Sequence, residues 1–267
     1  MKVDYKKLDA LSAKQEKQFI KELTQAYNSA YDDIAKEIGK LAVKGNLTKK
    51  EMLRFNRLTN LINSVSGELT LLNTKKVGLI ERLIADTYLT NFSGVADKIT
   101  DVVGLSINFP IPNKKAIYDS IRNPLFNLAI ENNADEVKRL IKRDITVAIM
   151  QGESIPKMGN RIKESLGKNG NNAVRIARTE TTGSLNRARL DAMNHADSVD
   201  GIILTKIWVA TNDPDRTRPS HLALDGERRK LDEEFSNGLM YPADQNGSAE
   251  EVINCRCSMI TDIEIVD

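Results

Sequence analysis

The sequence predicts an α+β protein that is mostly α-helical, with a long N-terminal helical hairpin, a helical middle region and a small C-terminal unit that contains an antiparallel β-sheet. Apolar residues recur at steps of three and four through the first third of the chain, as they do on one face of a helix. Near the other end, two runs of strand composition bracket a polar segment. We therefore divide the chain into segments 1–108, 109–200 and 201–267.

The N-terminal segment contains two helical patterns. The first begins at the capping box Ser12-x-x-Gln15, and its apolar face consists of Leu23, Tyr27, Tyr31, Ile34, Ile38 and Leu41. The second has a heptad-like seam that consists of Phe55, Leu58, Ile62, Val65, Leu69 and Leu72. Two long helices with a short connection predict an antiparallel hairpin. Such a hairpin serves either as an arm that binds a partner or as an ordinary bundle element.

The middle segment begins where prolines interrupt the helical pattern. Pro110 and Pro112 each lack a backbone N–H and restrict the preceding residue, so a boundary is expected there. Glycine and proline then separate four predicted helices, at about 114–121, 135–151, 154–167 and 172–196. The order of helix, turn and helix also fits a helix-turn-helix DNA reader. A basic helical layer that touches phosphates without reading sequence explains the same pattern.

Charge is distributed unevenly along the chain. The formal net charge is +2, yet residues 1–95 carry +5, residues 135–190 carry 12 basic and 6 acidic side chains, and residues 191–267 carry −9. A basic middle region favours weak, sequence-independent binding to double-stranded DNA. The candidate DNA-binding residues are Lys138, Arg139, Lys142, Arg143, Arg175, Arg187 and Arg189.

Several protein classes do not fit this sequence. The first residues are not followed by an apolar core segment, so no signal peptide is expected. No run of 18 apolar residues exists, so no membrane span is expected. The two cysteines are separated by one residue, and a disulfide between them would be strained. Reduced thiols in a cytoplasmic compartment are therefore expected.

The C-terminal segment contains both cysteines and one of the two histidines. Its strand-like runs at 203–210 and 258–266 are expected to pair antiparallel, because they bracket one compact unit. That pairing would bring Cys255 and Cys257 close to the turn that contains His221.

These three side chains form a candidate zinc site. Residues two apart on a strand face the same side, so both thiols can point at one imidazole. Zinc prefers thiolate and imidazole ligands, and the candidates for a fourth ligand are Asp213, Asp215 and Asp225. The alternative is that the thiols are small buried apolar groups, with Arg216 and Arg256 held by acidic neighbours.

Two enzymatic interpretations also use this segment. Cys255 or Cys257 could act as a nucleophile with His221 as its base, although no oxyanion hole can be named from the sequence. A magnesium-dependent nuclease could use acidic residues, namely Asp213, Asp215 and Glu180. The glycine-rich loop with Lys and Ser or Thr that cradles phosphates is absent from the sequence.

The order of these motifs resembles the C-terminal signature of phage minor head proteins of the Mu F-like family. The matching elements are Trp208, then Asp213-x-Asp215-Arg216-Thr217-Arg218-x-x-His221, then Asp225-Gly226, then Cys255-Arg256-Cys257, with Arg178-Thr179-Glu180 upstream. Many relatives carry Cys-x-x-Cys where this chain has Arg218-Pro219-Ser220-His221, so the first of those positions is not a cysteine here. The resemblance covers roughly residues 120–261.

The resemblance implies a structural protein carried inside the phage capsid and associated with the portal vertex. Its expected role lies in head assembly, in DNA packaging and ejection, or in both, and its expected location during assembly is the host cytoplasm. The implied partners are the portal protein, the major capsid or scaffolding protein, and viral double-stranded DNA.

The same signature also occurs joined to toxin domains, so a metal-dependent nuclease or toxin-like enzyme is the alternative function. This chain ends six residues after Thr261. We therefore expect no appended effector and no enzymatic activity.

Overall fold

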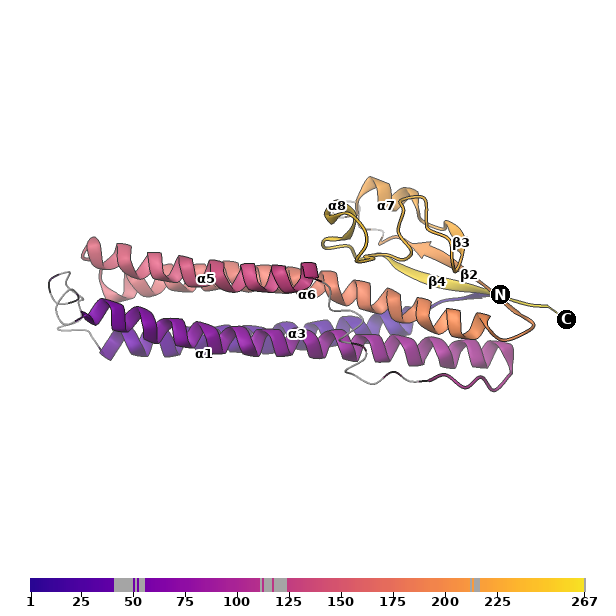
Figure 1. The fold of residues 1–267 in the computed structure, drawn as a ribbon, viewed down its shortest axis with the longest axis horizontal. Coiled ribbons are helices and arrows are strands. Elements are labelled where there is room, and N and C mark those ends of the chain that lie inside the picture. Colours follow the sequence, from indigo (N-terminus) through magenta and orange to yellow (C-terminus); the bar gives the residue numbers. More distant parts are fainter. Residues whose placement is uncertain are drawn as a thin grey trace. The chain divides into compact units, whose positions relative to one another are not determined.

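The computed structural model describes residues 1–40, 50, 52, 56–110, 112, 117, 124–211, 213 and 217–266. These residues are mostly helical and include an antiparallel sheet, which confirms the predicted fold class (Figure 1). The helices are α1 (Lys6–Lys40), α3 (Arg57–Val103), α5 (Pro124–Met150), α6 (Ile155–Asp197), α7 (Pro219–Ala223) and α8 (Ala249–Val252). The strands are β1 (Lys2–Val3), β2 (Ile202–Val209), β3 (Arg228–Lys230) and β4 (Ser258–Ile265).

The chain folds into two compact units, each built from segments that are distant in sequence. One unit combines residues 1–18, 81–123 and 175–267, and the other combines residues 19–80 and 124–174. Helices α1, α3 and α6 each contribute to both units. Because the units mix segments in this way, they do not decide whether the three sequence segments are separate domains, and that division stays a prediction.

Apolar helix faces form the core of the second unit. The long helices pack together there, and four of the six predicted residues of α1 are buried, namely Leu23, Tyr27, Ile34 and Ile38. On α3, Val65, Leu69 and Leu72 are buried as predicted. The predicted seam is rotated at its start, because Leu61 is buried while Leu58 and Ile62 are only half-buried. Leu41 and Phe55 lie outside the described residues.

A ladder of buried polar groups links the helices of the second unit. The Tyr27 hydroxyl donates to Asn169 Oδ1 over 2.5 Å, and Asn169 Nδ2 donates to the carbonyl of Asn133 over 2.7 Å. Lys76 Nζ donates to Asn133 Oδ1 over 2.6 Å, and burial lowers the pKa of Lys76 to about 8. Each polar group is therefore satisfied by a helix other than its own.

This ladder explains why the expected helix end at residues 167–170 and the helix-turn-helix interpretation are both wrong. The glycines at 167 and 170 were expected to end a helix, yet α6 runs unbroken from Ile155 to Asp197. Asn169 lies between those glycines and bonds to its neighbours from within the helix, so tertiary contacts override the weak local propensity. The turn required by the helix-turn-helix interpretation is absent between residues 155 and 197.

Two other helix starts differ from the prediction. Helix α1 begins at Lys6, so Ser12 is an interior residue, and its hydroxyl accepts from Asn91 Nδ2 rather than capping the helix. Helix α5 begins at Pro124, well before residue 135, because proline is favoured at the first helical position. The predicted helix at 114–121 lies almost entirely outside the described residues.

The sheet contains the predicted pair of strands. β2 and β4 are antiparallel, with a register from Ile202 opposite Ile265 to Val209 opposite Ser258. The order across the sheet is β1-β4-β2-β3, so the first residues of the chain extend the same sheet. Among the described helices, none is long and apolar enough to cross a membrane.

Candidate metal centre

His221 lies on the short helix α7, which follows strand β2. Pro219 sets the first position of this helix, where a missing N–H costs nothing. The guanidinium of Arg218 donates to the carbonyl of Ile253 over 2.6 Å and so ties α7 to the segment before the cysteines. The indole of Trp208 meets the imidazole edge-on, with ring centroids 5.4 Å apart. His221 is thereby fixed in a buried position.

The backbone of the cysteine segment is held by helix α6. Asn254 has a φ of 59°, a left-handed conformation that asparagine tolerates better than most residues, and its N–H donates to Thr179 Oγ1 over 2.9 Å. Asn186 Nδ2 donates to the carbonyl of Cys257 over 3.1 Å, and Asn186 Oδ1 accepts from the N–H of Met259 over 3.1 Å. The segment therefore leaves its turn in a defined direction before it enters β4.

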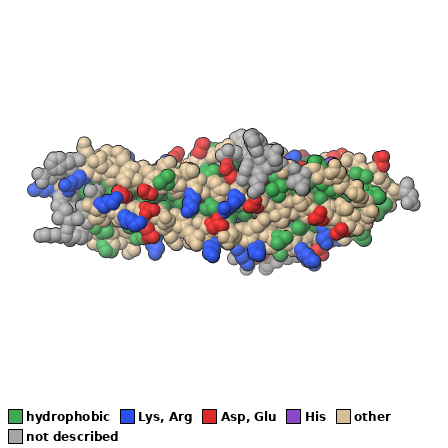
Figure 2. Space-filling model, turned by 90° about the horizontal axis from the view of Figure 1, so that it is seen from below, with side chains coloured by type: hydrophobic (Ala, Val, Ile, Leu, Met, Phe, Trp, Pro, Cys, Tyr) green, Lys and Arg blue, Asp and Glu red, His purple; other side chains and the backbone are tan. Residues whose placement is uncertain are grey.

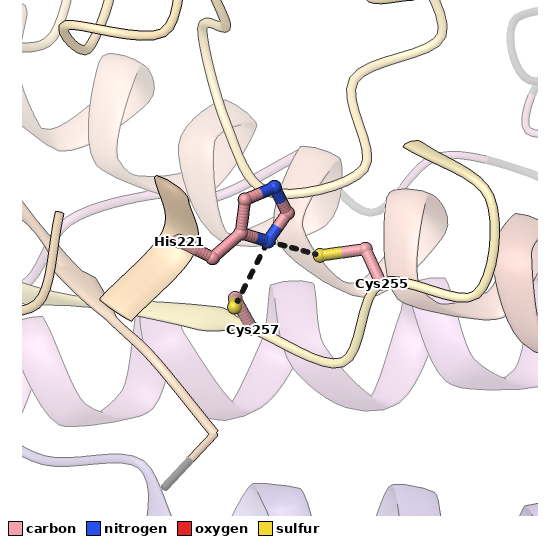
Figure 3. A group of neighbouring side chains, drawn as sticks. All are labelled: His221, Cys255 and Cys257. Atoms are coloured by element: carbon pink, nitrogen blue, oxygen red, sulfur yellow. Dashed lines mark hydrogen bonds between the residues drawn. The ribbon is translucent and has the colours of Figure 1, made fainter. Parts of the chain in front are cut away.

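Cys255, Cys257 and His221 meet in space (Figure 3). The Sγ atoms of Cys255 and Cys257 lie 3.6 Å and 3.5 Å from His221 Nδ1. The candidate ligand atoms all lie within 4.8 Å of one another, and all three residues are buried. The structure thus brings the three sequence-predicted ligands together, and whether they hold a metal stays a prediction.

Glu251 completes this arrangement, although sequence reasoning did not identify it. Its Oε2 lies 2.8 Å from His221 Nε2, and it also accepts from Asn237 Nδ2 over 3.2 Å. The pattern Ser248-x-x-Glu251 is typical of a helix start, and α8 does begin at Ala249. That signal places Glu251 on a helix, but it carries no information about its distance from His221.

The electrostatics of the cluster shift the pKa values of the two thiols in opposite directions. Contact with the Cys255 thiol, aided by His221, lowers the pKa of Cys257 in spite of burial. Its neighbour Cys257 and burial raise the pKa of Cys255. Burial alone would lower the pKa of His221, but Cys257 and Glu251 outweigh it and raise that pKa. The negative charge therefore resides on Cys257 first.

The predicted acidic ligands have other roles or lie elsewhere. Among the described residues, the group that could hold a metal contains neither Asp213 nor Asp225. Asp225 Oδ1 accepts from the N–H of Ala210 over 2.9 Å, and Gly226 follows it with a φ of 80°, a conformation that favours glycine. Asp215 and Arg216 lie outside the described residues.

Two basic residues of the signature, Arg178 and Arg256, converge on the N-terminal helix. Arg178 Nε donates to Glu16 Oε1 over 2.6 Å, and Arg256 Nη2 lies 3.5 Å from the same oxygen. The acidic partner of Arg256 is therefore on α1, rather than in the C-terminal segment where it was expected. Burial raises the pKa of Glu180 to about 7.

The DNA-binding candidates differ in their exposure and in whether an acidic side chain already pairs with them. Arg189 is fully buried, so it cannot contact phosphates in this structure, and its inclusion was wrong. Arg139, Arg143 and Arg187 are exposed but pair with Glu136, Asp144 and Asp191. Lys142 and Arg175 are exposed and Lys138 is half-buried. Basic and acidic side chains are also intermixed on the face drawn in Figure 2.

Comparison with known proteins gives one family match and two distant relatives. Residues 139–260 match the family model described as Phage Mu protein F like protein. The chain is 25% identical, over 98% of its length, to NAD(+)--arginine ADP-ribosyltransferase EFV of Enterococcus faecalis, and it spans only 54% of that protein. It is 24% identical, over 90% of its length, to Minor head protein GP7 of Bacillus phage SPP1, and spans 80% of that protein. No solved structure matches the chain.

Proposed function

Because residues 139–260 match the family model described as Phage Mu protein F like protein, we propose that the protein belongs to this family and is a minor component of a phage head. The observation that carries the proposal is the match over 90% of the chain to a relative named as a minor head protein. In this proposal the protein lies inside the capsid at the portal vertex. It acts there in head assembly, in DNA packaging and ejection, or in both, and its partners are the portal protein and the major capsid or scaffolding protein.

The way in which charged side chains are used supports a structural role. Arg178 bridges α6 to α1 through Glu16, and Arg189 bridges α6 to α1 through Asp9. Arg189 Nη1 also donates to the carbonyl of Met259 over 3.0 Å. These groups hold segments of the fold together.

The second candidate function is an enzyme, and one relative named as an ADP-ribosyltransferase favours it. The chain spans 54% of that relative, so the named activity belongs to a protein with a large part outside the match. For a nuclease, the required acidic cluster is not supported, because the described metal-binding group contains neither Glu180 nor Asp213. We therefore propose that the chain is not itself an enzyme. Transfer of ADP-ribose from NAD to an arginine substrate by the purified chain would overturn this part of the proposal.

The test of the head-protein role uses the portal protein of the same phage. The two proteins are co-expressed, purified through the portal protein alone, and imaged as a complex. We expect the chain to co-purify and to add density to the portal assembly. A portal that purifies without the chain, together with purified virions that lack its peptides in mass spectrometry, would refute the proposal.

Non-specific DNA binding is a further part of the proposal, and the second unit offers a matched test. The double variant Lys138→Gln with Lys142→Gln removes two basic groups of α5. The control Lys21→Gln with Lys75→Gln removes two exposed basic groups from α1 and α3 in the same unit. The slope of log affinity against log salt should become shallower by up to about 2 in the first variant, since each neutralised phosphate contributes about 0.9. Equal effects of both changes, or wild-type binding that does not depend on salt, would exclude α5 as the contact.

A further inference from the structure

We propose that Cys255 Sγ, Cys257 Sγ and His221 Nδ1 bind one zinc ion, and that Glu251 orients the histidine from outside the metal shell. The inference stands apart from the head-protein role, because it rests on the geometry of four side chains. It identifies a metal site that ties α7 to the segment entering β4.

The two nitrogen–sulfur distances within the cluster match those of a tetrahedral zinc site. Zinc–sulfur bonds of about 2.3 Å and zinc–nitrogen bonds of about 2.05 Å at a tetrahedral angle place nitrogen and sulfur about 3.6 Å apart. The two measured separations are 3.6 Å and 3.5 Å. Both nitrogen–sulfur separations therefore fit one zinc ion, and the two sulfurs, which lie within 4.8 Å of each other, would be about 3.8 Å apart when they share it.

The orientation of the imidazole distinguishes a metal site from a simple hydrogen bond. Nδ1 carries either one proton or one lone pair in the ring plane, so it can make one well-aligned bond. In the structure it faces two sulfur atoms at nearly equal distances (Figure 3). A metal ion between the three atoms satisfies both sulfurs and the nitrogen at once.

The opposite side of the ring has the partner that metal-binding histidines usually have. His221 Nε2 lies 2.8 Å from Glu251 Oε2, and a metal on Nδ1 leaves the proton on Nε2 to be donated to this carboxylate. Carboxylate partners of this kind fix the tautomer and the ring orientation of a ligand. Asn237 and Ser220 in turn contact the oxygens of Glu251 over 3.2 Å and 3.4 Å.

Charge balance identifies the kind of ion. Two thiolates and a neutral imidazole around a divalent ion give a centre without net charge, which lowers the cost of burying it beside Trp208. Thiolate and imidazole ligands select zinc over magnesium or calcium, which prefer oxygen ligands. Three protein ligands leave a fourth position for water.

The first experiment measures the metal content of the whole chain, without an affinity tag and purified without chelator. We expect about one equivalent of zinc by elemental analysis. After removal of the metal with chelator and reloading with Co²⁺, we expect thiolate-to-cobalt charge-transfer absorption and the intense visible bands of tetrahedral cobalt. Less than a tenth of an equivalent of zinc and no such bands would overturn the proposal.

The chain offers a matched control for the histidine, because it contains one other. His221→Ala should lose the zinc, whereas His195→Ala should keep it. His195 lies in the last turn of α6, and its ring contacts the carbonyl of Asn108 instead of the cysteines. Cys257→Ser should lose the zinc as well. Zinc retained by His221→Ala, or lost from His195→Ala with the fold intact, would contradict the assignment of ligands.

Glu251→Gln tests the role of the outer carboxylate without removing a ligand. We expect it to bind zinc about 10–100-fold more weakly, because the amide is a weaker and uncharged acceptor for the Nε2 proton. Competition with a chromophoric chelator measures this affinity directly, and Glu250→Gln, which neutralises an exposed carboxylate on the same helix α8, serves as the control. An unchanged affinity in Glu251→Gln would remove Glu251 from the site.

If a ligand variant fails to fold, the wild-type chain still decides the question. Alkylation of Cys255 and Cys257 is compared between zinc-loaded and metal-free protein by mass spectrometry. We expect zinc to slow the modification of both thiols by at least tenfold. Equal rates in the two forms would overturn the proposal.

Discussion

Arg189→Met tests whether the arginine buried on α6 is a structural group. Arg189 is 0% exposed, and its guanidinium donates to Asn91 Oδ1 over 3.0 and 2.9 Å and to the carbonyl of Met259 over 3.0 Å. Methionine fills most of the same space, but these two buried acceptors and the carboxylate of Asp9 all lose Arg189 as their donor. Each buried unpaired acceptor costs about 1–3 kcal/mol, and removing a buried charge offsets part of that cost. We expect a loss of about 3 kcal/mol in the free energy of unfolding.

Arg187→Met is the matched control, because it lies two residues away on the same helix. Its side chain is 51% exposed and pairs with Asp191. An exposed pair of this kind contributes about 0–1 kcal/mol. The two variants therefore separate the effect of a buried network from the general effect of losing an arginine from α6.

The assay is urea unfolding followed by the fluorescence of Trp208, the single tryptophan, which is buried in the same unit as Arg189. With a slope near 3 kcal/mol per molar urea, the midpoint of Arg189→Met should fall by about 1 M. The midpoint of Arg187→Met should shift by no more than about 0.3 M. Equal midpoints for the two variants would refute the buried network as a source of stability.

Three further predictions concern single positions. Burial raises the pKa of Glu180 to about 7, so the folded state keeps a proton that the unfolded state has already lost, and stability should fall as pH rises from 5 to 8. In Glu180→Gln, the difference in the free energy of unfolding between pH 5 and pH 8 should shrink by about 1–2 kcal/mol, as measured by urea titration at each pH. The same difference in the variant as in the wild-type chain would contradict this prediction. Leu61→Asp should lower the melting temperature far more than Ile62→Asp, because only Leu61 is fully buried; the reverse order would restore the seam predicted from sequence. Gly183→Ala should destabilise the chain, since its Cβ would lie 2.8 Å from the Ala243 carbonyl oxygen; a neutral calorimetric melting temperature would show that this loop can move.

The strands and the candidate ligands were predictable because their signals are local. Residues 203–210 and 258–266 carry strand composition, and the paired strands begin and end within a residue of those limits. Cysteine and histidine are themselves the ligand types, so the meeting of His221 with the two thiols followed once the strands were paired. By contrast, β1 and β3 contain two and three residues, too few to show any periodicity.

Polar residues inside helices were the main source of error. Ser12 and Asn169 are types that favour caps and turns, because their side chains compete for backbone hydrogen bonds. In the structure these side chains bond to groups far away in sequence, Ser12 to Asn91 and Asn169 to Asn133 and Tyr27. A local pattern cannot show that such a partner exists, so it predicts a helix end where the helix continues.

Helix α6 shows the same limit at the candidate site. Thr179, Asn186 and Arg189 are spaced by seven and three residues, so they share one helical face and hold the backbone from Asn254 to Met259. In the sequence this face appears merely polar and basic, which is also how a DNA-binding surface appears. The two possibilities differ only in whether a second segment covers the face. That segment enters β4 more than 60 residues later, and its register with β2 decides where the two cysteines lie. The basic character of α6 therefore predicts its function only after the strand pairing is known.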